Sequence, residues 1–285
     1  MKNVDYVNIF RKVEESIKNN LFVTPEEFEK KAERFKNIDF RSKNVDEIFW
    51  VLTCVVFYSG IRANMIEQKL AKIEKNLYGL KRLMNLSDDG KLSIKKDVGF
   101  PRKCDYCFEN ANEFSDLMNK FGSFTRYVES FGISDLEPDE SKLNLLREDL
   151  KRRFKGLGPR TVNHFLADLG FKNVLKPDRV ICRIFHRLGL IDSDKDINGA
   201  IREGRNFAAA TGNPIRYIDI IFVKYGQIGK SDVLGTRDGI CLEREPKCSK
   251  CGVTCFCNYF KEKNRDVWRR AGNRGGNLGA REGDD

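Results

Sequence analysis

The sequence has no hydrophobic segment long enough to cross a membrane. Its longest apolar run is IFWVLTCVVFY at residues 48–58, well short of the ~18 residues that a membrane span needs. The N-terminal stretch MKNVDYVNIFRKVEESIKNN is charged throughout and lacks the apolar centre of a signal peptide. The sequence therefore predicts a protein of the cytoplasm or nucleoid with no membrane partner, in which the run 48–58 belongs to a buried helix.

Sustained alternation of apolar and polar residues, which marks half-buried strands, is also missing. Helical spacing or helix caps occur along most of the chain instead, and they predict an all-α fold. The predicted helices cover residues 5–20, 25–37, 45–58, 62–77, 112–121, 124–131, 141–154, 159–169, 179–189, 195–210 and 214–225. Two stretches, 85–101 and 132–139, are predicted to be loops, and there is no internal repeat.

The length and net charge of the sequence indicate how many domains it forms and what kind of partner it binds. At 285 residues the chain can bury a sizeable core and form one large or two modest domains. Lys and Arg number 52 against 42 Asp and Glu, a net charge of +10. Such a surplus favours a nucleic-acid partner, although scattered surface lysines also produce it. The last residues, 261–285, are basic and rich in glycine and are predicted to form a disordered tail.

The stretch FKGLGPRTVNHFLADLG, residues 154–170, places two glycines between two predicted helices. Because Gly156 and Gly158 lack side chains, we expect open backbone N–H groups at the start of the second helix. Such groups attract phosphate by hydrogen bonding and through the helix dipole. Lys155 and Arg160 add positive charge beside the turn. An ordinary corner between two helices with a glycine cap is the alternative interpretation.

A carboxylate follows the hairpin. Asp178 lies 20 residues after Gly158, directly after Pro177 and directly before a helical run. Taken alone, this position indicates an N-cap residue, which needs no chemistry.

These features together resemble the helix-hairpin-helix DNA glycosylases of the endonuclease III superfamily. The residues that carry the resemblance are Gly156, Leu157, Gly158, Thr161, Asn163, Pro177, Asp178, Arg183 and Arg187. The resemblance implies a hairpin that grips DNA phosphate and Asp178 as the catalytic carboxylate. It also implies two helical domains flanking a DNA-binding cleft. We expect one domain at 41–175 with the hairpin, and a second formed by 1–40 and 176–260.

Four cysteines near the C-terminus form the pattern C-x6-C-x2-C-x5-C. They are Cys241, Cys248, Cys251 and Cys257. Four thiolates can bind one zinc ion or a [4Fe–4S] cluster, and the ligand type does not decide between them. The resemblance implies a [4Fe–4S] cluster, because the family uses this spacing on the C-terminal side of the hairpin. Cys255 is the alternative fourth ligand. Lys247, between two of the cysteines, is expected to contact DNA phosphate.

The other cysteines are predicted to be structural. Without an export signal the chain is expected in a reducing compartment, where cysteines are metal ligands or core residues more often than disulfides. Cys104 and Cys107 form a C-x2-C pair with no second pair nearby, which makes an incomplete metal site.

The segment Tyr58-Ser59-Gly60-Ile61-Arg62 follows the longest apolar run. It resembles the part of the family that fills the hole left in DNA by a flipped base. On that interpretation Ile61 or Arg62 is the wedge. A plain turn between helices at Gly60 is the alternative.

One position departs from the family pattern. In members that cleave the DNA backbone, a lysine two residues after the second hairpin glycine attacks C1′ and forms a Schiff base. Arg160 occupies that position here, and a guanidinium stays protonated and is a poor nucleophile.

The sequence therefore predicts a monofunctional glycosylase that acts as a monomer on double-stranded DNA. It flips out a damaged or mispaired base and hydrolyses the N-glycosidic bond, with alkylated or deaminated purines or mispaired bases as expected substrates. One alternative is a glycosylase with AP lyase activity in which Lys155 or Lys176 replaces the missing lysine. The other is a non-catalytic DNA-binding iron–sulfur protein.

Overall fold

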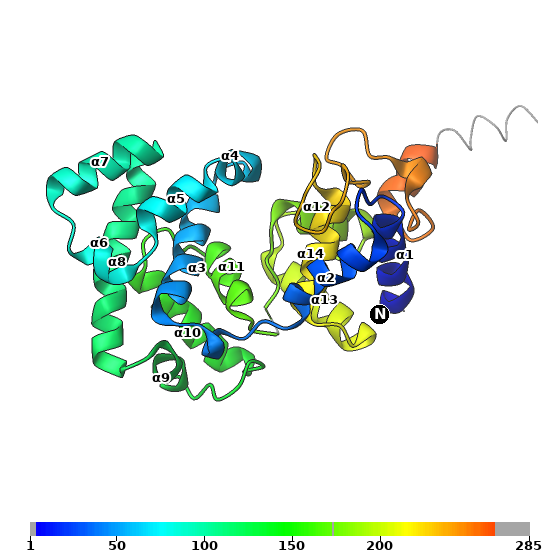
Figure 1. Ribbon diagram of the computed structural model, residues 1–285. Coiled ribbons are helices and arrows are strands. Elements are labelled where there is room, and N and C mark those ends of the chain that lie inside the picture. The colour runs from blue at the N-terminus through cyan, green and yellow to red at the C-terminus, as the bar shows by residue number, and fades with distance from the viewer. Residues whose placement is uncertain (1–3, 173, 266–285) are drawn as a thin grey trace, which may run out of the picture. The chain divides into compact units, whose positions relative to one another are not determined.

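A computed structural model describes residues 4–172 and 174–265 of the chain, and the described residues form helices connected by loops (Figure 1). The α-helices are α1 (Tyr6–Lys18), α2 (Pro25–Lys36), α3 (Val45–Tyr58), α4 (Ala63–Glu67), α5 (Leu70–Leu77), α6 (Leu80–Met84), α7 (Asp88–Val98), α8 (Pro101–Phe121), α9 (Phe124–Glu129), α10 (Glu140–Arg153), α11 (Thr161–Leu169), α12 (Arg179–Leu188), α13 (Ile197–Thr211) and α14 (Ile215–Gly226). Short 3-10 turns occur at Phe40–Ser42 and Cys248–Lys250. The described residues contain two isolated β-bridges and no strand, so the predicted all-α fold is confirmed.

The chain divides into two compact units. The hairpin unit contains Ala32–Asp178 and Gly212–Asp219, and the cysteine unit contains the chain up to Lys31, Arg179–Thr211 and the chain from Ile220 onward. The sequence placed the first boundary between residues 40 and 41. In the structure, residues 32–40 belong to the hairpin unit, where Phe40 stacks on Phe171 with ring centroids 5.4 Å apart.

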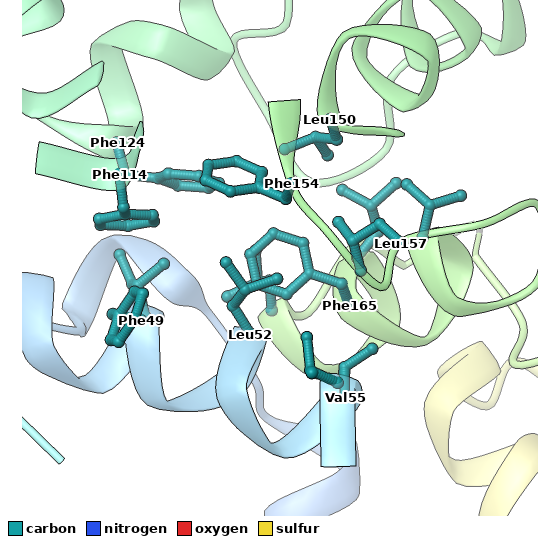
Figure 2. Packing of buried hydrophobic residues seen from close by; sticks show 14 of the residues in the cluster. Phe49, Leu52, Val55, Phe114, Phe124, Leu150, Phe154, Leu157 and Phe165 are labelled. Atoms are coloured by element: carbon teal, nitrogen blue, oxygen red, sulfur yellow. The ribbon is translucent and has the colours of Figure 1, made fainter. Parts of the chain in front are cut away.

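The core of the hairpin unit forms around α3 (Figure 2). This helix begins with a capping box between Asn44 and Glu47 and buries most of its apolar residues, as the sequence predicted. Its Phe49 lies 5.6 Å from Phe114 of α8, measured between ring centroids. The aromatic contacts continue to Phe154, 5.9 Å from Phe114. Since Phe154 is the residue directly before the hairpin turn, this core fixes where the turn lies.

The predicted loop at 85–101 is wrong over most of its length, because α7 occupies Asp88–Val98. Ser87 caps that helix by accepting a hydrogen bond from the Gly90 N–H, so the polar residues here start a helix. Helix α8 begins at Pro101, 11 residues before the predicted start at 112, and proline suits the first turn of a helix. The predicted helix 62–77 is divided into α4 and α5. Residues 132–139 lie outside the helices, as predicted.

The cysteine unit is built on a second aromatic cluster. The rings of Phe185, Phe207 and Phe222 lie 5.0–5.5 Å apart between centroids. Residues 261–265, the start of the predicted disordered tail, belong to a helical stretch that begins at residue 258. The rest of that tail lies outside the described residues. None of the described helices has the length and apolarity of a membrane span.

Candidate active site and cysteine pocket

The hairpin turn between α10 and α11 is held by side chains that reach it from neighbouring helices. Asn110 of α8, only 1% exposed, accepts a hydrogen bond from the Lys155 N–H at 2.7 Å and donates to the Lys155 carbonyl at 3.0 Å. Leu157, at the centre of the turn, is buried in the core. Sequence reasoning missed Asn110, because nothing near it in the chain marks it as a partner of a turn 45 residues away.

Thr161, the first residue of α11, closes the turn. Its hydroxyl accepts a hydrogen bond from the Gly158 N–H at 2.6 Å and donates to the Gly156 carbonyl at 3.0 Å. The expectation of open N–H groups is therefore wrong at Gly158. Helix α11 begins two residues later than predicted, although the Val162 N–H already donates to the Gly158 carbonyl at 3.0 Å.

The two glycines of the turn serve different purposes. Gly156 has a φ of +85°, and a Cβ atom there would lie 3.1 Å from a methyl group of Val56, so the fold itself requires glycine. Gly158 has no positive φ, and a Cβ atom there would meet nothing in the described residues closer than 3.9 Å. No described residue requires glycine at position 158, so the missing side chain leaves the surface of the turn accessible to a partner, while the Gly158 N–H itself is bonded to Thr161.

Lys155 and Arg160 flank the turn with charge that the protein does not neutralise. Lys155 is exposed and Arg160 half-buried, and neither forms an ion pair with another described residue. By contrast, Arg152 and Arg153 at the end of α10 are both paired with Asp149. The free positive charge near the turn therefore belongs to the two residues that the sequence singled out.

Asp178 lies at the end of the segment that leads from α11 to α12. It is half-buried, and its N–H donates to the Lys176 carbonyl at 2.8 Å, which makes a tight turn around the buried Pro177. The hairpin and Asp178 belong to the same compact unit. The predicted phosphate-binding turn and the predicted catalytic carboxylate therefore belong to the same structural unit.

Four charged side chains form a network of ion pairs that begins at Lys176, two residues before Asp178. The Lys176 ammonium donates to Asp168 of α11 at 2.6 Å. Arg216 of α14 pairs with Asp168 at 3.2 Å and with Asp219 at 2.6 Å. Sequence reasoning named Lys176 but missed the other three, because the ion pair that joins Asp168 to Arg216 links residues about 50 positions apart.

The environment shifts the titration of these groups. Burial, and after it the charge of Arg216, lower the pKa of Lys176. Burial also raises the pKa of Asp219 to about 7. The positive charges of Arg216 and Lys176 lower this pKa, and the negative charge of Asp178 raises it further. The same surroundings lower the pKa of His164 to about 3, burial again being the largest cause, so this imidazole is neutral at physiological pH.

The predicted wedge segment forms the turn after α3. Lys103 of α8 holds this turn by donating to the Val56 carbonyl at 2.7 Å and to the Ser59 carbonyl at 2.8 Å. Ile61 packs against the core, whereas Arg62 is exposed. Of the two wedge residues that the sequence offered, Arg62 is the one whose side chain faces solvent.

The four predicted ligand cysteines come together in the cysteine unit. They line one small pocket, together with Arg187, Ile240, Pro246, Thr254, Tyr259 and Phe260. Cys255 is exposed and does not line this pocket, which favours Cys257 as the fourth member of the set. Among the described residues, no three His, Cys, Asp or Glu side chains are close enough together to hold a single metal ion.

Polar groups surround the sulfur atoms of the pocket. The Arg187 guanidinium donates to the Cys241 sulfur at 3.3 Å, and the Phe260 N–H donates to the Cys257 sulfur at 3.4 Å. The Tyr225 hydroxyl lies 2.8 Å from the Cys251 sulfur. Burial raises the pKa of Cys248, Cys251 and Cys257, and the hydrogen bonds to Cys251 and Cys257 act in the opposite direction by stabilising the thiolate.

The remaining predicted residues lie apart from this pocket or are already paired. Lys247 forms an ion pair with Asp238 at 2.5 Å, so a DNA phosphate would compete with that carboxylate. Cys104 and Cys107 are buried in the core of the hairpin unit, and burial raises the pKa of Cys104 to about 12. These two thiols are core residues, consistent with the structural role predicted for them.

Comparison with known proteins gives matches only among solved structures. No protein-family model matches the sequence, and a search of curated proteins finds no significant match. The 8-oxoguanine DNA glycosylase of Methanocaldococcus jannaschii superposes with a TM-score of 0.53 at 20% identity, over 74% of this chain and 90% of that one. Its complex with a 15mer DNA containing 8-oxoguanine gives 0.52 at 21%, over 75% and 94%.

The 8-oxoguanine DNA glycosylase of Thermotoga maritima is also similar, with a TM-score of 0.48 at 21% identity, over 68% of this chain and 86% of that one. The two superpositions on the Methanocaldococcus protein show that this chain has the fold of helix-hairpin-helix DNA glycosylases. The resemblance seen in the sequence is confirmed at the level of the fold.

The two hairpin glycines lead to a prediction. Gly158→Leu is expected to fold with stability close to that of the unmodified protein, because a Cβ atom at this position meets no described atom closer than 3.9 Å and the backbone has no positive φ. It should weaken binding to undamaged duplex DNA by about tenfold, since the side chain keeps the phosphate from the backbone. Titration of labelled duplex by fluorescence anisotropy measures this.

Gly158→Ala serves as the graded control and should lose less affinity. Gly156→Ala is expected instead to lower the melting temperature, because of its positive φ and its contact with Val56. Equal duplex affinity of Gly158→Leu and the unmodified protein would show that the hairpin is only a structural corner.

Proposed function

We propose that this protein is a DNA glycosylase of base excision repair. It binds duplex DNA that contains a damaged or mispaired base, flips that base out and hydrolyses its N-glycosidic bond. The observation that carries the proposal is the combination, in one compact unit, of a hairpin turn bared at Gly158 and the carboxylate of Asp178. The glycosylase fold supports it.

Binding begins at the phosphates. The unpaired charges of Lys155 and Arg160 attract the DNA backbone, and Gly158 lets a phosphate approach the turn without a steric barrier. Contacts of this kind carry no sequence information and release counterions, so duplex affinity should fall steeply with salt. Arg62 is the residue suited to fill the space left by the flipped base.

Asp178 then acts at the sugar. Its carboxylate either activates a water molecule for attack at C1′ or stabilises the positive charge that grows on the sugar as the base leaves. Neither role for Asp178 needs an amine nucleophile, in agreement with arginine at position 160.

This proposal is tested on a panel of duplex oligonucleotides, each with one lesion or mismatch. The unmodified protein is expected to give strand breaks only after alkali treatment, since it removes the base and leaves the backbone intact. Arg160→Lys, which restores an amine at the family's lyase position, is expected to break some strands without alkali and to be trapped on the DNA by borohydride.

Two results would contradict the proposal in different ways. If no member of the panel becomes alkali-sensitive, the protein is not a glycosylase for those lesions, and a purely DNA-binding role gains support. If the unmodified protein breaks the strand without alkali and is trapped by borohydride, it is a lyase that uses a lysine other than one at position 160.

We further propose that Cys241, Cys248, Cys251 and Cys257 hold a [4Fe–4S] cluster. Around zinc, thiolates bind at about 2.3 Å in a tetrahedron, which would place the four sulfurs about 4 Å apart. The four cysteines line one pocket, yet no three of them lie close enough together to hold a single metal ion, which favours a larger cluster with cysteine ligands. When bound, the cluster would cross-link the loop 241–257, and no step of base excision passes through it.

The metal is tested by composition. Protein purified without oxygen is expected to be yellow-brown, with broad absorbance near ~400 nm and about four irons per chain. Cys257→Ala should lose the colour and most of the iron, whereas its neighbour Cys255→Ala should keep both. Colourless protein with one zinc ion per chain would overturn the assignment. Loss of iron in Cys255→Ala but not in Cys257→Ala would show that Cys255 is the fourth ligand in place of Cys257.

A further inference from the structure

The buried charges of Lys176, Asp168, Arg216 and Asp219 have no part in the phosphate grip or in the pocket of cysteines. They form an unbroken chain of three ion pairs, with distances of 2.6, 3.2 and 2.6 Å in that order. The side chain of Asp219 is fully buried, whereas those of Arg216, Lys176 and Asp168 are 11%, 18% and 28% exposed. Three separate parts of the hairpin unit contribute to it: α11, the segment before α12, and the start of α14.

A contribution to the stability of the fold does not by itself explain this network of ion pairs. Taking charges out of water is costly, and well-packed apolar residues in place of a buried ion pair often give equal or higher stability. Two of its polar atoms, Nε of Arg216 and Oδ1 of Asp219, are buried with no hydrogen-bond partner in the described part of the protein. Unsatisfied groups of this kind are uncommon in protein interiors and call for an explanation.

This network of charges is connected to Asp178 through Lys176. At one end, the carbonyl of Lys176 accepts the hydrogen bond from the Asp178 N–H, and the proline between them restricts the backbone. The anchoring of the Lys176 side chain by Asp168 therefore fixes the backbone that carries Asp178. At the other end, Asp219 pairs with Arg216 at 2.6 Å, and the charge of Asp178 contributes to its raised pKa.

We infer that Lys176 and Asp219, joined through Asp168 and Arg216, are positioning residues that hold the Asp178 carboxylate where positive charge develops on the sugar. This inference rests on the proposed glycosylase function. Lys176 anchors the backbone that carries Asp178, and the ion pairs that run through Asp168 and Arg216 to Asp219 hold Lys176 in turn. The chain keeps Asp178 in place before DNA binds, so that little reorganisation is needed during reaction.

Lys176 also has the chemistry of a different role. Its lowered pKa would favour a neutral amine, which is the form that attacks C1′ in a lyase. Its ammonium is, however, bound to Asp168 at 2.6 Å, and a paired ammonium is not a nucleophile. The positioning role is therefore the one that the geometry supports, and borohydride trapping separates the two.

Protonation of Asp219 within this charge network should also make the excision rate depend on pH. The charged groups around Asp219 are Arg216, Lys176, Asp178 and Asp168. With a pKa of about 7, Asp219 is ionised and firmly paired with Arg216 above neutral pH, and it becomes protonated below. The excision rate is expected to fall as pH drops through about 7, and this fall should be missing in Asp219→Asn.

The experiment compares single-turnover excision rates on a lesion duplex that the unmodified protein processes, at several pH values. Lys176→Met and Asp219→Asn are expected to excise about tenfold to a hundredfold more slowly, the usual effect of a small misplacement of a reacting group. Their affinity for the same duplex should be unchanged. Lys176→Arg, which can keep the ion pair with Asp168, should recover most of the rate.

The matched control is Glu203→Gln. Glu203 is a buried carboxylate of the cysteine unit that accepts a hydrogen bond from the Tyr6 hydroxyl at 2.7 Å, and it has no contact with the charge chain. This variant should keep both the rate and the pH profile. If Lys176→Met fails to fold, the comparison of Asp219→Asn with Glu203→Gln carries the test.

The outcomes separate the inference from the function on which it rests. If the unmodified protein excises a base and both variants excise it at the same rate and with the same pH profile, the positioning role is wrong and the glycosylase function stands. If borohydride traps the unmodified protein on abasic DNA and Lys176→Met abolishes trapping, Lys176 is a nucleophile instead. If the unmodified protein excises no base, both proposals fail together.

Discussion

The packing of the hairpin against α3 is the interaction on which the rest of the site depends. Phe154 ends α10 and Phe165 lies within α11, and both rings are buried in the same core as Leu157 of the turn (Figure 2). These apolar residues hold the two helices, and Leu157 and Gly156 fit the turn to the core. The turn is therefore free to carry a glycine at 158 that the fold does not require.

A second consequence concerns the arginines that follow Asp178. Arg183 donates to the carbonyls of Gly226 and Cys241, and Arg187 donates to the carbonyl of Leu242 at 2.6 Å. Both arginines therefore hold the first part of the cysteine loop. Helix α12 thus begins directly after the candidate catalytic residue and supports the candidate cluster site along its length.

The sequence was informative where one local segment determines the structure. The apolar run within 45–58 predicted a buried helix, and the cysteine spacing predicted a common pocket. It was misleading at 85–101, where Ser, Asp and Gly suggested a loop but Ser87 is a helix cap. It could not reveal Asn110 or the pairing of Asp168 with Arg216, because those contacts join distant segments and follow from the tertiary structure.

The central claim is that the Asp178 carboxylate removes the base, and Asp178→Asn tests it most directly. Asparagine keeps the size of the side chain and the oxygen that suits a position before a helix, while the negative charge is lost. The single-turnover excision rate on a lesion duplex is expected to fall by roughly a hundredfold or more, with binding of the same duplex retained. Excision at the rate of the unmodified protein would contradict the account and assign the reaction to another carboxylate.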